Sequence, residues 1–257
     1  MKDTIDRGPA PAGYKKLDLH IHTPFSACYI DHIKQGQPPT DPRAIIDAAL
    51  EARLDGIAIT DHNGVEMVAT LRALAAGTGL TVLPGTEIST RGGHCLAIFP
   101  EEIDLDAVRE MLRAIGFPPE TWGDGFKRTE LWMDEVFARI AALGGIAIGA
   151  HVDREPRGFL ASDERPSDKR RIYDSPHLAA LEVTDPRSVA RYGEGRDLRY
   201  PGARPCIQSS DAHAPWEIGR RPVLMRMEAV SLAGIRAALA AWPEGVRFPA
   251  ARAEAVA

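Results

Sequence analysis

Residues 17–23 read Leu-Asp-Leu-His-Ile-His-Thr, an alternation of apolar and polar residues that is typical of a β-strand. Successive side chains of a strand point to opposite faces, so His20 and His22 should share one face while Leu19 and Ile21 share the other. The two imidazoles then point to one place. Taken alone, the pair is either a solvated polar face or a pair of ligands, and the rest of the chain decides between these interpretations.

The composition indicates a globular protein. Of the 257 residues, 44% are hydrophobic and 26% are charged, and the formal net charge is −5. These values predict a single domain, 1–257, and exclude global disorder. The acidic balance argues against a general basic surface for long duplex nucleic acid, but it is compatible with a short nucleotide held in a local basic cleft. The oligomeric state is not indicated.

Cysteine usage and hydropathy predict a cytoplasmic protein. The three cysteines, Cys28, Cys95 and Cys206, are odd in number and widely spaced, which argues against a disulfide framework and for a reducing compartment. The N-terminus lacks an apolar signal core, and no apolar run approaches the roughly 20 residues that span a bilayer, so no membrane partner is expected. Residues 1–13 are expected to form a flexible leader and residues 249–257 a frayed tail.

Strand and helix patterns alternate along the chain. Apolar runs bounded by Gly and Pro predict strands at 17–23, 56–60, 80–89, 94–99, 146–150, 178–183, 205–210 and 223–227. Helical spacing of apolar residues predicts helices at 42–54, with Asp41 as N-cap, and at 65–76, 105–115, 128–143 and 232–241. Alternation of this kind predicts an α/β fold with a parallel sheet that closes into a barrel.

Polar residues follow the strands at the points where these end. His62, His151, Asp211 and His213 each come after a strand, while Glu87 and His94 lie on adjoining strands. With the pair on the first strand, six of the eight histidines occupy such positions, and only His32 and His177 do not. Sites are built at the C-terminal rim of a barrel, and so many buried ionisable groups need a cation, so the pattern predicts a divalent-metal site. The excess of His over Cys favours Zn, Mn or Fe over Ca or Mg.

Six short motifs in chain order resemble those of the PHP (polymerase and histidinol phosphatase) family. They span most of the chain and read His20-x-His22, Thr60-Asp61-His62, Gly85-Thr86-Glu87, His94-x-Leu96, Ala150-His151 and Ser210-Asp211-Ala212-His213. The resemblance implies a distorted, TIM-like (β/α)7 barrel that holds up to three divalent metals at the C-terminal rim of its strands. It also implies phosphoester hydrolysis as the usual activity.

The resemblance gives each motif residue a role. One metal would be held by His20, His22, Glu87 and Asp211. Glu87 would bridge to a second metal, which His94 and His151 also bind, and a third metal would be held by His62 and His213. The residues expected to be catalytic are Glu87, Asp211 and His213.

The chain departs from the family pattern just after its first motif. Many relatives have an aspartate five residues after the second histidine, where this chain has Ala27. Other relatives have a histidine one residue later, where this chain has Cys28, which could act as a thiolate ligand. Asp31 and His32 are close enough in the chain to substitute instead. We therefore expect either two or three divalent ions, of Mn, Zn or Fe.

The predicted activity is metal-dependent hydrolysis of a phosphomonoester or phosphodiester. A hydroxide that bridges two metals would attack phosphorus, while the third metal or His213 stabilises the leaving oxygen. Rim arginines are expected to bind phosphate, namely Arg154, Arg157 and Arg220. Glu182 and Asp18 are expected to orient ligand histidines.

The run Gly-Thr-Glu-Ile-Ser-Thr at 85–90 looks more like the nucleotide- and oligonucleotide-directed branch of the family than the histidinol-phosphate branch. This resemblance implies a nucleotide or a short oligonucleotide as the substrate. Histidinol phosphate is the alternative substrate, and the alternative classes are a non-catalytic metal-binding module and a hydrolase of amides or lactones on a similar barrel. Aromatic residues in rim loops either stack on a base or anchor the loops; they are Trp122, Phe126, Trp132, Phe159, Tyr173 and Trp216.

Overall fold

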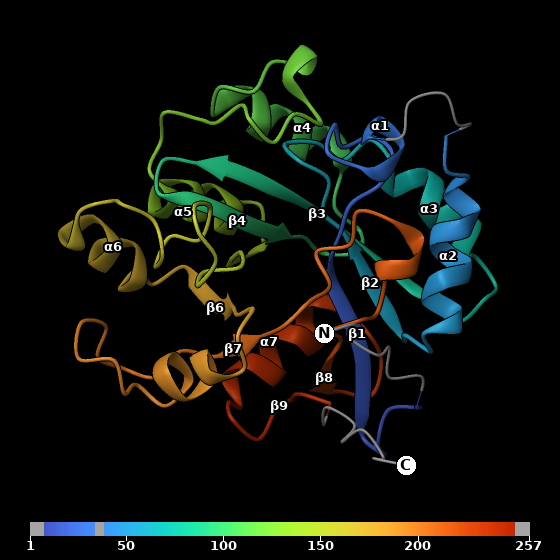
Figure 1. The fold of residues 1–257 in the computed structure, drawn as a ribbon. Coiled ribbons are helices and arrows are strands. Elements are labelled where there is room, and N and C mark those ends of the chain that lie inside the picture. Colours follow the sequence, from blue (N-terminus) through green and yellow to red (C-terminus); the bar gives the residue numbers. More distant parts are fainter. Residues whose placement is uncertain (1–7, 34–38, 250–257) are drawn as a thin grey trace.

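One curved sheet of nine strands organises the computed structural model, which describes residues 8–33 and 39–249 (Figure 1). Its strand order is β7-β6-β5-β4-β3-β2-β1-β8-β9. The strands are β1 (Tyr14–Ile21), β2 (Gly56–Ile59), β3 (Thr81–Thr90), β4 (Gly93–Ile98), β5 (Ile146–Gly149), β6 (Leu178–Glu182), β7 (Cys206–Ile207), β8 (Val223–Arg226) and β9 (Val246–Arg247). The eight expected strands are all present, and β9 is a short strand that the sequence pattern did not predict.

The expectation of a parallel sheet is wrong for part of the barrel. β4 runs antiparallel to both β3 and β5, because β3 and β4 form a hairpin where a parallel connection would need a crossover helix. Gly92 and Gly93 make this turn with φ values of +110° and +140°, which a residue with a Cβ rarely adopts. β8 also runs antiparallel, to both β1 and β9. The other neighbouring strands are parallel.

The sheet curls back on itself at β1. The first half of this strand, from Tyr14 to Leu17, pairs with β8. At its other end Ile21 forms a bridge with Ala212, and the backbone N–H of His22 donates to the carbonyl oxygen of Ala212 at 2.9 Å. The chain that follows β7 therefore lies against the end of β1. Strands β1–β7 thus form the nearly closed, distorted barrel that was predicted.

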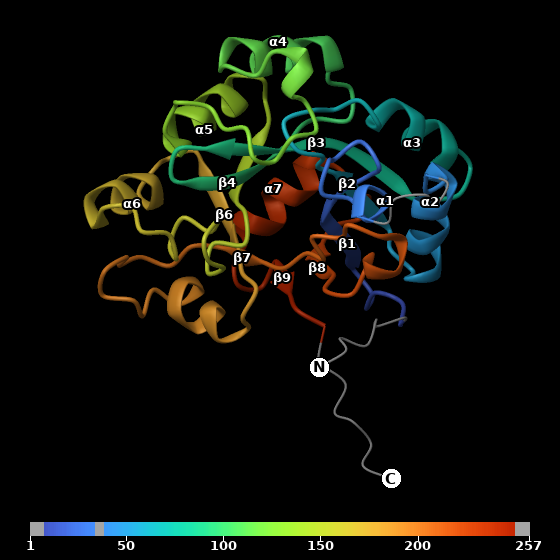
Figure 2. The same ribbon diagram turned by 45° about the horizontal axis from the view of Figure 1, so that its top comes forward.

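Helices cover the outside of this sheet. Figure 2 shows α2 to α6 around it, with α7 nearer the middle of the molecule, where it contacts β6 and β8. The helices are α1 (Ile30–Ile33), α2 (Pro42–Glu51), α3 (Val68–Ala75), α4 (Leu105–Ala114), α5 (Met133–Ala142), α6 (Pro166–Tyr173) and α7 (Leu232–Ala240). Short 3-10 turns cover Pro119–Thr121 and Pro215–Glu217, and a π-helical turn covers Val189–Gly193.

Two helix starts show how local chemistry sets the boundaries. α2 begins as predicted, with the side chain of Asp41 accepting from the backbone N–H of Arg43 and Pro42 in the first turn. α5 begins later than the expected residue 128, because the residues before it extend the edge of the sheet. The Thr129 N–H donates to Ser89 O and the Arg91 N–H donates to Leu131 O, each at 3.0 Å.

Apolar side chains form two layers. One lies between the sheet and the outer helices, and the other fills the barrel interior, where Leu232 and Ile235 of α7 pack. Leu19 and Ile21 were expected to share one face of the strand. The structure places them in different layers, Ile21 in the outer one and Leu19 in the barrel interior. The reason is that the pairing of β1 with β2 shifts register between Asp18 and Ile21.

The two chain ends fall largely outside the described residues. The predictions of a flexible leader at 1–13 and a frayed tail at 249–257 therefore concern segments of which only 8–13 and 249 are described. Among the described residues, no helix combines the length and apolar character needed to cross a membrane.

Candidate metal centre

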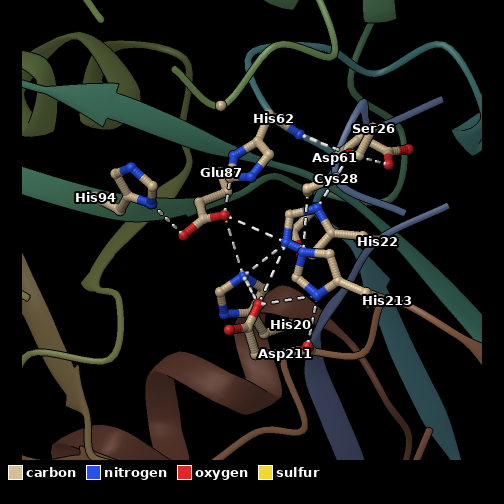
Figure 3. A network of polar contacts seen from close by, with 12 residues as sticks. His20, His22, Ser26, Cys28, Asp61, His62, Glu87, His94, Asp211 and His213 are labelled. Atoms are coloured by element: carbon tan, nitrogen blue, oxygen red, sulfur yellow. Dashed lines mark hydrogen bonds and ion pairs between the residues drawn. The ribbon is translucent and has the colours of Figure 1, made fainter. Parts of the chain in front are cut away.

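Eight side chains with nitrogen or oxygen donors meet at the rim of the barrel. Figure 3 labels all of them except His151. Seven of them are buried, and the eighth, His213, is partly exposed. They are the eight metal ligands expected from the sequence, namely His20, His22, His62, Glu87, His94, His151, Asp211 and His213. The structure brings all of them into one cluster, and metal binding by them stays a prediction.

The hairpin explains how His94 reaches this rim. His94 is the second residue of β4, so in a fully parallel sheet it would lie at the opposite end of the barrel. Because β4 is antiparallel to its neighbours, its first residues lie near Glu87 of β3 and near the end of β5, which His151 follows. The departure from a parallel sheet is therefore what places His94 in the site.

Glu87 lies at the centre of the cluster, with both carboxylate oxygens against imidazoles. Oε1 is 2.9 Å from His94 Nδ1 and 2.9 Å from His151 Nε2. Oε2 is 3.1, 3.2 and 3.4 Å from ring nitrogens of His62, His22 and His20, respectively. Burial alone would raise the pKa of Glu87, but the neighbouring His20, His94 and His62 hold it well below its usual value. An ionised carboxylate between two groups of imidazoles has the position needed to bridge two cations.

Asp211 provides the second carboxylate, after β7. Its Oδ1 is 3.2 Å from His20 Nε2 and 3.4 Å from His22 Nε2. Burial would raise its pKa, but His20 and His22 hold it well below the usual value. Asp211 is therefore ionised and faces the same two imidazoles as Glu87.

The backbone is strained at two of the strand ends. His151 has φ +31° and Asp211 has φ +52°, a region that costs residues other than glycine about 1–3 kcal/mol each. The strained position of His151 is held by a bond of 2.7 Å from its N–H to the carboxylate of Glu182. The surrounding hydrogen bonds thus fix a conformation that aims these side chains into the cluster.

Polar groups behind the cluster orient its rings. Glu182 lies 3.1 Å from His20 Nδ1, as expected, which leaves Nε2 to face Glu87 and Asp211. The corresponding partner of His22 was not predicted from the sequence. It is Ser26, whose Oγ lies 3.0 Å from Nδ1. Ser26 donates in turn to buried Asp61 at 2.6 Å. The sequence signals for this chain of contacts are the spacing of four residues between His22 and Ser26 and the place of Asp61 in the motif Thr60-Asp61-His62.

Asp18 has a different role from the one expected. Its carboxylate accepts from the backbone N–H groups of Ser210 and Gly219, at 3.0 and 2.8 Å. Asp18 therefore holds the segment that carries Asp211 and does not orient a ligand ring.

The cluster has two electrostatic halves. Burial opposes protonation of His20 and His22, but the carboxylates around them raise the pKa of His20 well above its usual value and that of His22 to about 9. In the other half burial dominates, so the pKa values of His62 and His94 are lowered and that of His213 falls to about 4. Without a metal, protons are therefore retained beside Asp211, while the rings of His62, His94 and His213 are neutral near pH 7.

Three residues in the loop after β1 were candidates to replace the aspartate that is missing at Ala27, namely Cys28, Asp31 and His32. Cys28 is half-buried, and its Sγ lies 3.0 Å from His213 Nε2. Asp31 points elsewhere, because its carboxylate accepts from the N–H and hydroxyl of Thr40 at 2.6 and 2.8 Å. The side chain of His32 lies outside the described residues. Of the candidates that the structure describes, only Cys28 reaches the cluster.

Two of the three predicted phosphate-binding arginines line the hollow above the cluster. Arg154 donates to Asp211 Oδ2 at 2.6 Å, and Arg157 donates to Gly125 O at 3.1 Å. Arg220 is not among the lining residues, because its guanidinium donates to Ser210 O and pairs with Glu217. The structure therefore places Arg220 in support of the Asp211 segment, away from the expected phosphate contact.

The hollow measures about 160 Å³ and carries one strongly exposed aromatic side chain, Phe126, which is 81% exposed. The Arg157 guanidinium lies 5.4 Å from the centre of its ring. The other candidate aromatics are placed differently. Phe159 and Tyr173 are buried in the core, Trp122 and Trp132 pack against it, and exposed Trp216 lies beside α2.

The donors form three groups that could each hold a divalent cation, with ligand atoms within 4.8 Å of one another. These groups are His20, His22, Glu87 and Asp211; His62, Glu87 and His94; and His22, Cys28, His62 and His213. Two buried ring nitrogens, Nδ1 of His62 and Nδ1 of His151, have no partner in hydrogen-bond geometry. Such groups are costly to bury unless a ligand satisfies them, so the cluster fits a metal centre rich in imidazole.

The barrel and its donor cluster define a class. A solved structure described as containing a predicted PHP-like metal-dependent phosphoesterase shares this architecture, so the chain has the PHP-type fold that its motifs indicated. This structure is of a two-domain protein from Bacteroides vulgatus. It is 18% identical, with a TM-score of 0.60 over 92% of this chain and 67% of that chain.

Two further structures are endonucleases by name. The lesion-specific endonuclease PfuEndoQ from Pyrococcus furiosus is 18% identical, with a TM-score of 0.64 over 91% of this chain and 57% of that one. A complex of Endonuclease Q with a 27-mer duplex substrate that carries an abasic lesion at the active site is also 18% identical, with a TM-score of 0.62 over 88% of this chain and 56% of that one. The chain therefore spans little more than half the length of these endonuclease chains.

Relatives detected by sequence are fewer than those detected by structure. No protein-family model matches the chain. An uncharacterized protein of Methanocaldococcus jannaschii is 29% identical over 137 residues, which cover 53% of this chain and 67% of that protein. The similarity of fold is therefore shown by the solved structures alone.

Proposed function

We propose that the protein is a metal-dependent phosphoesterase that hydrolyses a phosphomonoester or phosphodiester. The observation that carries this proposal is the position of Glu87. Its two oxygens contact imidazoles of two neighbouring donor groups, as a carboxylate that bridges two cations would. Bound divalent cations supply Lewis-acid polarisation of phosphoryl oxygens and water of lowered pKa as the nucleophile.

The arginines at the hollow complement a phosphate. Arg154 and Arg157 both line it, and their guanidinium groups can form charge-assisted hydrogen bonds to phosphate oxygens. Burial lowers the pKa of His213 to about 4, so its ring is neutral near pH 7. We therefore assign His213 to metal binding and not to protonation of the leaving group.

The proposed substrate is a nucleotide or a short oligonucleotide. Phe126, at the mouth of the hollow, offers an aromatic face next to Arg157, and base stacking on such a face tolerates any sequence. The Endonuclease Q complex is named with a 27-mer duplex substrate, which supports nucleic acid as the substrate class but is longer than the short oligonucleotide proposed here. The hollow of about 160 Å³ suits a phosphate group with part of its ester, so the rest of the substrate would lie over the rim.

The test is hydrolysis by protein loaded with Mn or Zn. The panel contains nucleoside monophosphates, short oligonucleotides, a duplex with an abasic lesion, histidinol phosphate, glycerol phosphate, and an amide and a lactone. Glu87→Gln and Asp211→Asn should abolish turnover while circular dichroism shows a retained fold. The matched control is Glu66→Gln, which removes a carboxylate paired with Arg109, away from the site, and should leave the rate unchanged.

Each outcome separates one class. Cleavage of histidinol phosphate alone would replace the proposed substrate, and cleavage of the amide or lactone alone would replace the proposed chemistry. Bound metal without hydrolysis of any compound would identify a metal-binding module. Full activity in both carboxylate variants would refute the assignment of the site.

A further inference from the structure

We propose that Cys28 binds a metal ion through its thiolate, together with His62 and His213, at a sulfur-containing position of the centre. This inference deepens the proposed function and rests on it, because it concerns a further cation of the same site. It predicts that one metal position selects a soft or borderline divalent ion, zinc or ferrous iron, over manganese.

The donor atoms are close enough for one cation. Cys28 Sγ lies 3.0 Å from His213 Nε2, and the four donors of the group lie within 4.8 Å of one another. Tetrahedral zinc, with bonds of about 2.0–2.1 Å to nitrogen and about 2.3 Å to sulfur, separates its donors by roughly 3.3–3.6 Å. Side-chain shifts of about an ångström therefore suffice to form the site.

The rings that face Cys28 present the correct atoms. The Nδ1–H of His213 is directed at the carbonyl oxygen of Asp211, at 2.9 Å, so the Nε2 lone pair points to the sulfur position. Nδ1 of His62 is buried without a partner in hydrogen-bond geometry, and it lies 3.1 Å from Glu87 Oε2. The ring of His62 cannot retreat, because it packs on Gly125, where an added Cβ would lie 2.5 Å from Nε2.

Counting ligands shows why a sulfur donor is needed. His22 belongs to two donor groups, but its Nε2 faces Glu87 and Asp211, so we assign it to the group that contains His20. Glu87 and His94, with His151, supply the middle position. His62 also belongs to two groups, and we assign it to the last position because Glu87, His94 and His151 already give the middle position three ligands. His62 and His213 alone would then give the last position two ligands, one fewer than the three protein ligands of catalytic zinc sites. Cys28 supplies the third.

The backbone fixes Cys28 beside these histidines. The Ala27 N–H donates to Gly123 O at 2.8 Å, and the Ile30 N–H donates to His213 O at 3.0 Å. The second bond joins the Cys28 loop directly to the segment that carries His213. The short distance between Cys28 and His213 is therefore built into the fold.

Metal binding at this position converts the thiol to a metal thiolate. The S–H bond breaks, the sulfur–metal bond forms with the electron pair of that S–H bond, and the proton passes to solvent, so no oxidant or reductant takes part. The competing explanation is a simple S–H···N hydrogen bond from Cys28 to His213, with the cations held by the other donors alone.

Cobalt(II) distinguishes the two explanations without any enzyme assay. Chelator-treated protein is reloaded with Co²⁺, and its near-ultraviolet absorption is recorded, because only a thiolate ligand gives a sulfur-to-cobalt charge-transfer band. We expect the band in the natural protein and its loss in Cys28→Ser and in Cys28→Asp. The matched control is Cys206→Ala, which removes the buried β7 thiol next to Arg204 and should leave the band intact.

Metal counting gives a second measurement. Cys28→Ser should retain one zinc equivalent fewer than the natural protein after gel filtration, while Cys28→Asp should recover it with a preference shifted towards manganese. A cobalt-loaded natural protein without the band, or a band that survives in Cys28→Ser, would overturn the proposal. A band in a protein that hydrolyses no phosphoester would instead refute the proposed function and leave the thiolate ligand standing.

Discussion

At the scale of single residues, Phe126 differs from the rest of the site. Its backbone is fixed by hydrogen bonds nearby, but its side chain is exposed to solvent. Gly123 N–H donates to His62 O at 2.7 Å, and Phe126 N–H donates to Asp124 Oδ1 at 2.8 Å, so the backbone before Phe126 is well fixed. The Phe126 ring is nevertheless 81% exposed at the edge of the hollow. A fixed, exposed aromatic ring beside a phosphate-sized hollow is what a stacking contact requires.

Phe126→Ala should weaken binding of nucleotides selectively. Loss of one base-stacking contact, worth about 1–3 kcal/mol, should raise KM for a nucleoside monophosphate roughly five- to 150-fold with little change in kcat. KM for glycerol phosphate, which has no base, should not change, and Phe126→Trp should preserve the nucleotide KM. Steady-state kinetics of the three enzymes with both substrates make the measurement.

The control is Trp216→Ala, which removes the other exposed aromatic ring, beside α2 and away from the hollow. Its KM values should equal those of the natural protein. An equal rise of KM for both substrates in Phe126→Ala would mean that Phe126 shapes the hollow and does not stack on a base.

The candidate ligand residues could be inferred from the sequence, whereas the hydrogen-bond partners that orient them could not. Strand-end positions and the motif order of the PHP family pick out His20, His22, Glu87 and the others without any coordinates. The partners of these rings come from distant parts of the chain, as Glu182 does for His20, and sequence spacing carries no signal for such contacts. The displacement of Arg220 from the hollow has the same origin, since its partner Ser210 O is set by tertiary packing.

At the scale of elements, the least predictable feature was the direction of β4. Its apolar run is indistinguishable from that of a parallel strand, and only Gly92-Gly93 indicates a tight turn in place of a helix. Helix existence followed from apolar spacing, and the Asp41 cap set the start of α2 correctly. The start of α5 was misplaced because residues before it pair with the end of β3, which is a long-range effect.

The hairpin should be sensitive to a single methyl group at Gly93. Gly93 has φ +140°, and an added Cβ would lie 2.5 Å from Arg157 O, the atom that accepts from the His94 N–H. Gly77→Ala is the matched control, since Gly77 has φ +77° with no atom within 4 Å of the added Cβ. Backbone strain should lower the free energy of unfolding by about 1–2 kcal/mol at Gly77, and overpacking should add about 1–3 kcal/mol at Gly93.

Urea unfolding of both variants measures this difference, and zinc affinity gives an independent comparison. Gly93→Ala should weaken zinc binding because it displaces His94, while Gly77→Ala should not. Equal stability losses in the two variants would show that the loop around Arg157 yields easily and does not fix the hairpin.

At the scale of the whole molecule, the site coincides with the closure of the barrel. The bridge between Ile21 and Ala212 joins β1 to the chain after β7, and His20, His22, Asp211 and His213 flank it. A cation bound by residues of both segments therefore links the first and last strands of the barrel. Metal binding and fold stability should be coupled, since a ligand that binds only the folded state stabilises it by about 2.7 kcal/mol at a concentration of 100 Kd.

The coupling predicts that the stability of the metal-free protein declines at alkaline pH and that bound metal removes this decline. In chelator-treated protein the pKa of His22 is raised to about 9, so its stabilisation is complete below the unfolded value of about 6.5 and is lost as pH rises towards 9. The pKa of His213 is lowered to about 4, so the unfolded state gains a proton first and stability falls as pH drops from about 6.5 towards 4. The pKa of His20 is also raised, so like His22 it stabilises the fold less as the pH rises. The pKa values of His62 and His94 are lowered, so like His213 they reduce the stability as the pH falls.

Stability of the metal-free protein should therefore be greatest near pH 6.5 and decline on both sides, as scanning calorimetry in chelator would show. Zinc keeps the ligand rings unprotonated in the folded state, so the alkaline decline should disappear and the melting temperature should stay high up to pH 9. His22→Asn is the informative variant, because it lacks the ring that loses its proton at alkaline pH. The melting temperature of its metal-free form should therefore fall less between pH 6.5 and 9 than that of the natural protein. A metal-free natural protein whose melting temperature still rises between pH 6.5 and 9 would show that the carboxylates around His20 and His22 do not hold protons there. Protonation of the cluster would then not contribute to the stability of the closed barrel.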